Sequence, residues 1–445
     1  MTRPVRTSAA LLALIAAGVV PAVAADWLSC GGDPLGSGWQ RHGKALTVAN
    51  VKDLKLLWKR QLDNRSGDSL LSAPVIAGPT ITHRGVRELV FIADPHDNLY
   101  AVDADLGTLF WKRHFDVSPM PDQKSKSPCG LGVTFAPAAP VIEPDPDEED
   151  DDNDDEAGPM RPLYAVASDG RLHTIRVSDG ADTHSPVNFL PPNAHYSSLN
   201  FWSGNVYAAT CNGAPNGLWS IDVKRPGAKP GFYSAKAGHQ IAISPAGTVY
   251  GAILDGIVAL QPGSLRMKQF SKTPAIAVTA VKYQGRELIA AETQDGRLLL
   301  LDGRDLSVVA EYQTPFTRFN GLASWQDSRG VRWIYAAGEQ NLRAFRLAGP
   351  SSGPKLELAW TYESMGRSGP PAVTNGVLFL LTGAGEAGPG YSTLIALDAA
   401  TGKELYTSGT TIRLSYVPYL AVANGHVCFG NANNTLYCFG LPMER

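Results

Sequence analysis

Five cysteines are the residues of this chain that could form covalent cross-links, and they stand at positions 30, 129, 211, 428 and 438. Cys428 and Cys438 flank a predicted turn around Asn433 symmetrically. On two paired strands they should therefore lie opposite each other, within reach of a disulfide bond. Two bonds at most leave one cysteine over, and we expect this to be Cys30. The sequence holds no Cys-x-x-Cys-His motif for covalent attachment of haem.

A second set of residues could bind a small ligand, because each stands where the chain leads into a predicted inner strand or turns in a hairpin loop. The set is His239, Gln240, Arg318, Asn320, Arg367, Ser368 and Tyr416, with Asn212 from the hairpin loop. Arg318 and Arg367 are suited to clamp a ligand rich in carboxylates, since a guanidinium binds a carboxylate with two parallel hydrogen bonds. The alternative is that these side chains hydrogen-bond loop carbonyls of neighbouring units.

Other reactive patterns are missing from the sequence. There is no Gly-x-Gly-x-x-Gly motif, phosphate-binding loop, zinc-type cluster or nucleophile elbow, and the nine histidines are not spaced as metal ligands. An acidic run, Asp147–Glu156, lacks the Gly and Glu that an EF-hand loop needs, because Asp155 and Arg161 stand there. We interpret it as part of a solvated surface insertion at about 143–160. With a formal net charge of −3, the chain shows no excess of positive charge for nucleic acid.

The first 24 residues have the pattern of an export signal. Arg3 and Arg6 precede the apolar run Ser8–Val20, and Ala22–Ala24 forms a small-x-small cleavage site. A retained membrane anchor is the alternative, but Pro21 ends the apolar run early. We therefore expect a mature chain of residues 25–445, exported to the periplasm or the cell exterior. No later stretch is apolar enough to predict a transmembrane segment.

Composition points to a large β protein. The chain has 445 residues with 45 Gly and 32 Pro, while charged residues make up 18%. Helical bundles and coiled coils tolerate Gly and Pro poorly, and disordered chains carry more charge and fewer apolar residues.

A repeat of turn, apolar strand and Asp runs through the chain. Its eight copies have their first apolar residue at Leu99, Leu172, Leu218, Ile257, Leu298, Leu342, Leu394 and Leu436. Most copies are 39 to 52 residues apart, and the one gap of 73 contains the acidic run. Each copy follows a strand-like run and a hairpin turn such as Asp255-Gly256 or Asp295-Gly296, whose residues accept positive φ. Counting the flanking runs gives four strands per unit, which is the size of a propeller blade.

The repeat predicts an all-β fold, an eight-bladed β-propeller of four-stranded antiparallel blades spanning residues 25–445 as one domain. The last copy lacks an outer strand, whereas Asp53–Leu62, with Trp58, matches the outer strands that carry Trp111 and Trp360. An N-terminal strand that completes the last blade would close the ring and leave no open edge. A count of seven blades would require discarding one copy, at 318–363.

Propeller geometry also assigns roles to repeated residues. We expect the tryptophans to pack between blades. The aspartates that end the repeats should bond the following turn, as at Asp103 and Asp398. Cys129 precedes the inner strand of the second blade and Cys211 lies in a hairpin loop of the third. Such loops open on one face, so we predict a second disulfide between these two cysteines.

Leu99–Gly107, followed by Trp111, and Leu394–Lys403 resemble the repeat of propellers that bind pyrroloquinoline quinone (PQQ). Asp26-Trp27 with Gly31–Asp33 is similar to the entry of quinoprotein dehydrogenases, and the resemblance extends from about residue 26 to the C-terminus. It implies eight blades and, in the enzymes, PQQ with calcium at one face of the ring. There the cofactor oxidises alcohols or sugars by hydride transfer, helped by an Asp base.

The resemblance is uneven at the functional positions. The segment from Cys211 to Pro215 is similar to the family's calcium-binding Asn segment. The two adjacent, linked cysteines of the alcohol dehydrogenases are not found here, and no matching motif places the metal-binding Glu or the Asp base.

Two hypotheses follow. One is a PQQ- and calcium-dependent oxidoreductase acting on alcohols or sugars, with a small-molecule ligand. The other is a non-catalytic propeller that binds a protein partner as an assembly scaffold in the cell envelope. An acidic residue beside an Asn and an Arg at the mouth of the channel would distinguish the first from the second.

Overall fold

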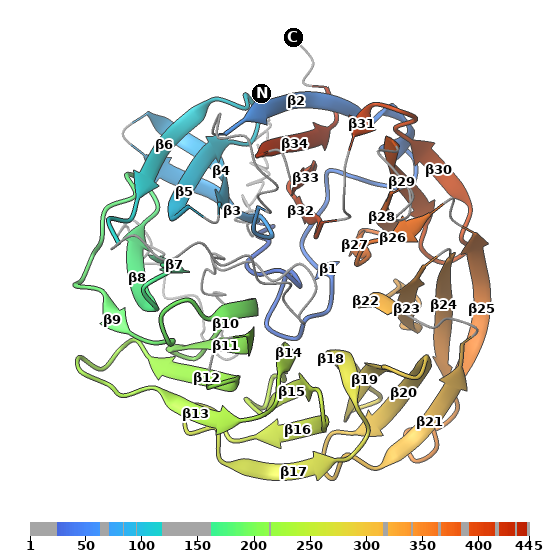
Figure 1. The fold of residues 1–445 in the computed structure, drawn as a ribbon. Helices are drawn as coiled ribbons and strands as arrows, with labels where there is room; N and C mark the ends of the chain where they lie inside the picture. The colour runs from blue at the N-terminus through green and yellow to red at the C-terminus, as the bar shows by residue number, and fades with distance from the viewer. Residues whose placement is uncertain are drawn as a thin grey trace, which may run out of the picture.

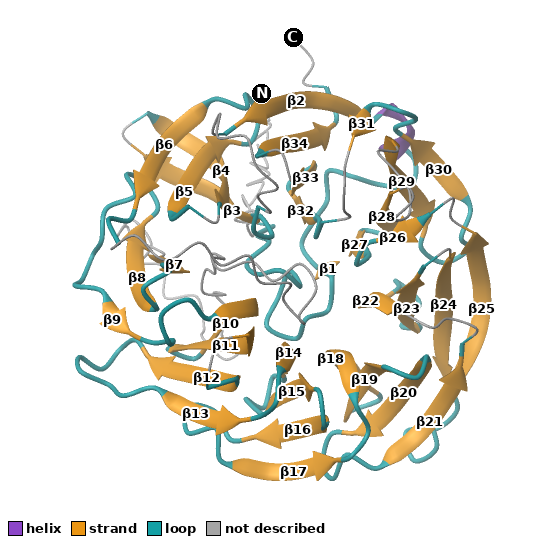
Figure 2. Cartoon of the chain, in the orientation of Figure 1, coloured by secondary structure: helices purple, strands orange, loops and turns teal. Residues whose placement is uncertain are grey.

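The computed structural model describes residues 25–442, except 63–70, 83, 95, 118–161, 213–214, 315–318, 340, 364–365, 384–390, 414–417 and 432–433. The export signal, the acidic insertion and Cys129 lie outside the described residues. Figure 2 shows that strands and loops make up almost all of the described chain, with one short 3-10 helix, η1 (Val51–Asp53).

The strands form eight blades around a central axis, as the repeat predicted (Figure 1). Blades 1 to 3 comprise β3 (Val75–Thr82), β4 (Gly85–Ala93), β5 (Asn98–Asp103) and β6 (Leu109–His114); β7 (Pro162–Val166), β8 (Arg171–Arg176) and β9 (Val187–Asn188); and β10 (His195–Trp202), β11 (Asn205–Asn212), β12 (Gly217–Asp222) and β13 (Gly231–Ser234). Blade 2 has three described strands, and neighbouring strands within these blades are antiparallel.

Blades 4 to 6 repeat this antiparallel order, with a register shift in several of the strand pairs. They comprise β14 (Gly238–Ile243), β15 (Val249–Ile253), β16 (Gly256–Leu260) and β17 (Met267–Ser271); β18 (Ala275–Tyr283), β19 (Arg286–Thr293), β20 (Arg297–Asp302) and β21 (Val308–Gln313); and β22 (Phe319–Gln326), β23 (Arg332–Gly338), β24 (Asn341–Ala348) and β25 (Lys355–Glu363). Inner strands are buried and outer strands largely exposed, as β19 and β21 show. The apolar cores therefore lie within and between blades.

Blades 7 and 8 incorporate the N-terminal strands. Blade 7 comprises β27 (Ala372–Thr374), β28 (Val377–Gly383), β29 (Tyr391–Asp398) and β30 (Glu404–Thr407), extended by β26 (Arg367–Ser368), β31 (Ile412–Arg413) and β1 (Trp39–Gln40). Blade 8 comprises β32 (Ala421–Ala423), β33 (His426–Gly430), β34 (Thr435–Gly440) and β2 (Lys55–Gln61). Strand β2 lies antiparallel to β34, with Trp58 opposite Cys438, and Figure 1 shows β2 (blue) along the outer side of β34 (red). The predicted ring closure is confirmed.

The repeated tryptophans pack between blades, as expected. The indole Nε1 of Trp58 donates to the carbonyl oxygen of Ala104 in blade 1 at 2.7 Å. Trp111 makes the equivalent bond to Val177 in blade 2 at 2.8 Å. The repeated aspartates bond the turns that follow them: Asp103 Oδ1 accepts from the Leu106 amide at 2.9 Å, and Asp398 Oδ1 accepts from the Thr401 amide at 2.9 Å.

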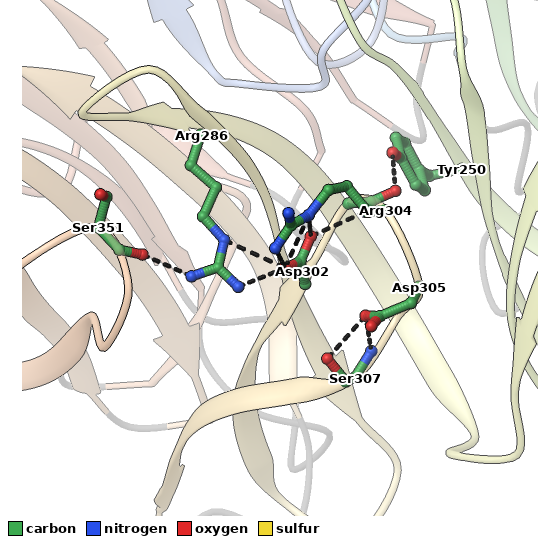
Figure 3. Close-up of polar contacts among 8 residues, drawn as sticks. Tyr250, Arg286, Asp302, Arg304, Asp305, Ser307 and Ser351 are labelled. Atoms are coloured by element: carbon green, nitrogen blue, oxygen red, sulfur yellow. Dashed lines mark hydrogen bonds and ion pairs between the residues drawn. The ribbon is translucent and has the colours of Figure 1, made fainter.

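Asp302, the corresponding aspartate of blade 5, forms ion pairs with two arginines (Figure 3). Arg286 and Arg304 both bind its carboxylate, and together they hold its pKa well below the usual range. Arg286 also donates to the carbonyl oxygen of Ser351 in blade 6, so this cluster links two blades. On the other side of blade 5, the hydroxyl of Tyr250 donates to the carbonyl oxygen of Gly303 at 2.8 Å and links blade 4.

A segment that we name the N-terminal plug, residues 26–40, crosses the middle of the ring (blue in Figure 1). Its carbonyl oxygens accept hydrogen bonds from inner-strand amides of four successive blades, in the donor–acceptor pairs Ile243–Pro34, Ala280–Leu35, Ser324–Ser37 and Val373–Gly38, at 2.7–3.0 Å. Trp27 exchanges two backbone hydrogen bonds with Ile76 of blade 1. The plug therefore ties five blades together across the axis, a role that the sequence patterns did not predict.

Candidate functional site

The described members of the predicted ligand-binding set belong to one face of the ring, where the inner strands begin. Arg318 and Tyr416 lie outside the described residues. Asn212 ends β11 opposite His195, and its side chain is not described. Arg367 is exposed on β26, and the adjacent Ser368 is buried. These positions share a face, but the described side chains do not form one contacting group.

Gln240 is hydrogen-bonded to a neighbouring blade, and Asn320 is hydrogen-bonded within its own blade. Gln240 Oε1 accepts from the Val278 amide at 3.3 Å, so this side chain links blades 4 and 5. Asn320 Nδ2 donates to the Gly338 carbonyl at 3.2 Å, and its Oδ1 has no hydrogen bond to any described residue. The Gln240 amide oxygen therefore makes a structural hydrogen bond, whereas the Asn320 amide oxygen is available to a ligand.

Two histidines begin inner strands at this face. His239 is the second residue of β14, and His195 is the first residue of β10. Burial lowers the pKa of both imidazoles. Both are therefore expected to be neutral near pH 7, as hydrogen-bonding groups and not as charges.

Glu292, which the sequence patterns did not single out, is the most unusual group at this face. It stands near the end of β19, opposite Ala277 of β18, and has an exposed fraction of 0%. Neither carboxyl oxygen has a hydrogen-bond partner among the described residues. Burial raises its pKa well above the usual range, and the backbone amide of Gly321, although not in good hydrogen-bond geometry, opposes this effect in part. Gly321 directly follows Asn320, so the acid lies near the backbone of an Asn.

Two further groups approach Glu292 from distant parts of the chain. Tyr419 precedes β32 of blade 8, and Cys30 belongs to the N-terminal plug. Burial raises the pKa of Tyr419, and negative charge on Cys30 and Glu292 would raise it further, so the three groups interact electrostatically. Burial also raises the pKa of the Cys30 thiol to about 11. We call Cys30, Glu292 and Tyr419 the axial cluster, in which thiol and phenol stay protonated near pH 7.

The chemistry of this arrangement follows from the unpartnered carboxyl. A buried carboxylate is costly unless a hydrogen bond or cation compensates it. Glu292 could therefore receive a hard cation or accept a proton from a bound substrate. No group of three or more His, Cys, Asp or Glu side chains within the described part of the chain could hold a metal ion by itself. A cation here would thus take other ligands, such as the Asn320 amide oxygen or an oxygen-rich cofactor.

One of the two predicted disulfides is confirmed, and for the other only one of the two cysteines is described. Cys428 and Cys438 lie opposite each other on β33 and β34, with their Cα atoms 4.1 Å apart, and form a disulfide. Cys211 is also disulfide-bonded. Its predicted partner, Cys129, lies outside the described residues, and Cys30 is a free thiol.

Known proteins resemble this chain over part of its sequence and in its fold. No protein-family model matches it. Over 105 residues, 23% of the chain, it is 32% identical to a probable quinate dehydrogenase (quinone) from Xanthomonas campestris pv. juglandis, and the match spans only 13% of that relative.

Solved structures match over nearly the whole chain. The quinohemoprotein alcohol dehydrogenase from Comamonas testosteroni superposes with a TM-score of 0.60, over 96% of this chain and 82% of the other, at 16% identity. The chain shares the fold of the quinohemoprotein alcohol dehydrogenases. A europium-containing methanol dehydrogenase gives a TM-score of 0.61 over 94% of this chain and 98% of the other, at 10% identity. The resemblance to PQQ-binding propellers is confirmed, and at these identities it establishes the fold alone.

The segments of the chain that the structure describes include no helix with the length and apolar character needed to cross a membrane.

Proposed function

We propose that this chain is a PQQ-dependent oxidoreductase acting on alcohols or sugars, with the cofactor and a calcium-like cation bound where the inner strands begin. The observation that carries the proposal is Glu292, a fully buried carboxyl with no described partner, beside Asn320 at that face. The feature expected of the catalytic hypothesis is an acid beside both an Asn and an Arg. Glu292 and Asn320 correspond to the acid and the Asn, whereas Arg318 lies outside the described residues. The names of the quinate, alcohol and methanol dehydrogenases above support the choice of chemistry.

The described residues fit the cofactor in their donor chemistry. Glu292 and the Oδ1 atom of Asn320 are oxygen donors, which calcium and similar hard cations prefer. We assign these two residues to the cation. We assign the exposed guanidinium of Arg367 to a carboxylate of the cofactor, and the same role for Arg318 remains a prediction from the sequence. When bound, PQQ with its cation supplies a quinone that accepts a hydride from the alcohol carbon.

The chain's own groups would prepare the site in three ways. Burial raises the pKa of Glu292 and so favours its protonated form, and a bound cation would favour the carboxylate form. Tyr419 and Cys30 stay protonated and add no negative charge beside that carboxylate. The N-terminal plug, fastened to five blades by backbone hydrogen bonds, holds Cys30 near Tyr419 in this site.

We also infer export, to an oxidising compartment such as the periplasm. The Cys428–Cys438 disulfide supports this location, because such bonds persist outside the reducing cytosol. That residues 1–24 form the signal for this export remains a prediction from the sequence.

Addition of PQQ and calcium to the purified protein tests the proposal. The quinone absorbance and the reduction of a dye by a panel of alcohols and sugars are the two measurements. Binding with dye reduction supports an enzyme. Absence of both a spectral change and binding heat would leave the non-catalytic scaffold as the better account.

A further inference from the structure

Trp39, at the end of the N-terminal plug, has two guanidinium groups against its ring. The Cζ atom of Arg41 lies 4.3 Å from the ring centroid, and that of Arg332 lies 5.5 Å from it. Both distances are within the range of cation–π attraction. Two like charges are thereby held around one indole.

Arg332 is buried without a carboxylate partner. Its exposed fraction is 7%, and none of the described acidic side chains forms an ion pair with it. One terminal nitrogen, Nη2, donates to Gln326 Oε1 at 3.0 Å, while Nε is buried and has no hydrogen bond to the described residues. Burial and then the charge of Arg41 lower the pKa of Arg332 to about 10, which shows that the pair repel each other.

The neighbouring acid does not neutralise the pair. Asp33 Oδ2 binds Arg41 Nη2 at 3.1 Å, and the same carboxylate accepts two hydrogen bonds from Ser37, at 2.6 and 2.9 Å. Only Arg41 of the two guanidinium groups is therefore paired with a carboxylate, and the deeper group, on Arg332, is not paired with any described acid. A buried cation in this state is costly unless a counter-ion compensates it.

This cluster lies away from the proposed cofactor face. Arg332 begins β23 and pairs with Gln326, whereas Asn320 lies near the far end of the same two strands, where Phe319 pairs with Gly338. Arg41 follows the plug, at the point where the chain leaves the channel, and is exposed. The feature is therefore independent of the proposed oxidoreductase site.

We propose that Arg41 and Arg332 form a binding site for a small oxyanion of the carboxylate or phosphate class, with Trp39 as its wall. A guanidinium presents parallel N–H groups that match such oxygens, and two of them confer preference for an anion over a neutral molecule. The bound oxyanion would fasten the end of the plug to blade 6. Lys44, exposed three residues beyond Arg41, adds positive charge on the approach.

Isothermal titration with inorganic phosphate, sulfate and citrate, at constant ionic strength and without PQQ or calcium, tests this site. We expect one oxyanion class to bind the wild-type chain, and Arg41→Gln to weaken binding roughly tenfold or more. Arg332→Lys, which keeps the charge but loses the planar fork, should weaken it similarly. The control is Arg329→Gln, because Arg329 is exposed in the same hairpin and already pairs with Asp327 at 3.1 Å.

The three anions distinguish the two classes, since preference for citrate indicates carboxylate and preference for phosphate and sulfate indicates a tetrahedral oxyanion. Arg41 is exposed, so Arg41→Gln keeps the test valid if Arg332→Lys fails to fold. Absence of binding heat with all three anions would overturn the proposal. Equal affinity in wild-type and Arg41→Gln protein would also overturn it.

Discussion

Trp58 and Gly107 join the two ends of the propeller ring. Trp58 belongs to β2, which completes blade 8, and Gly107 follows β5 in blade 1. The contact is so close that a Cβ atom on Gly107 would lie 2.5 Å from Trp58 Cγ. The Trp58 indole also bonds Ala104 at 2.7 Å. A strand from the start of the chain therefore seals the interface at which the last blade meets the first.

Gly107→Ala should destabilise the ring at this closure. The φ angle of +65° strains any side chain there, and the added methyl group collides with the indole. We expect a loss of about 2–4 kcal/mol in the free energy of unfolding, measured by chemical denaturation.

Gly227→Ala is the matched control. Its φ angle is +72°, but an added Cβ atom would meet nothing within 4 Å, so this variant carries the backbone strain alone. Equal losses in the two variants would show that the contact with Trp58 contributes nothing to closure.

The closing interface also contains a pH-dependent ion cluster. His426 in blade 8 faces two acids of blade 1, with Nδ1 3.5 Å from Glu88 Oε1 and Nε2 3.3 Å from Asp105 Oδ1. Burial alone would lower the pKa of His426, but the two carboxylates outweigh it and raise the pKa to about 9.

Because the folded pKa of His426 is above its unfolded value of about 6.5, its contribution is complete below pH 6.5 and is lost as pH rises through 9. The shift corresponds to about 3 kcal/mol. The free energy of unfolding of the wild-type chain should fall across this window, and that of His426→Gln should fall much less. Parallel pH curves for the two proteins would contradict the assignment.

The disulfide assignment predicts the number of free thiols in each chain. In the unreduced, denatured protein we expect one free thiol per chain, from Cys30, because Cys428–Cys438 and Cys211 are bonded. Three free thiols would show that the proposed partner of Cys211, Cys129, is wrong and that Cys211 is not bonded within the chain. Labelling followed by mass spectrometry makes the count and locates the label.

Local patterns were sufficient to predict the ring and its closure. Each blade carries its own turn residues and a repeat such as Leu394–Lys403, and Trp58 matched Trp111, so the missing strand of blade 8 was recognisable. The Cys428–Cys438 bond followed from the symmetry of one hairpin. These features depend on residues close together in the sequence or on copies of one pattern.

The candidate site could not be found in the same way. Glu292 ends an apolar run that looks like any other blade strand, and only its position after Leu288–Ala291 hinted that it would be buried. The interpretation of Glu292 as a site residue depends on its proximity to Cys30 and Tyr419, which are more than 100 residues away from it in the sequence. The path of the plug through the channel has no periodic pattern, so no rule of spacing predicts it.

If Glu292 serves a ligand, its removal should stabilise the protein without that ligand. Glu292→Gln replaces a buried carboxyl by a neutral group of similar shape, so we expect the free energy of unfolding near pH 7 to rise by about 1–3 kcal/mol. Glu311→Gln, an exposed site on β21 of the same blade, should change it by less than about 0.5 kcal/mol. A marked destabilisation in Glu292→Gln would indicate a structural role for the carboxyl.

The central claim is that Glu292 helps to bind a cation and PQQ at the face where the inner strands begin. The most direct measurement is titration of PQQ with calcium into wild-type, Glu292→Gln and Glu311→Gln protein, followed by quinone absorbance and binding heat. We predict saturable binding in wild-type and Glu311→Gln protein, and its loss in Glu292→Gln. Absence of binding in the wild-type chain, or equal binding in Glu292→Gln, would contradict the account.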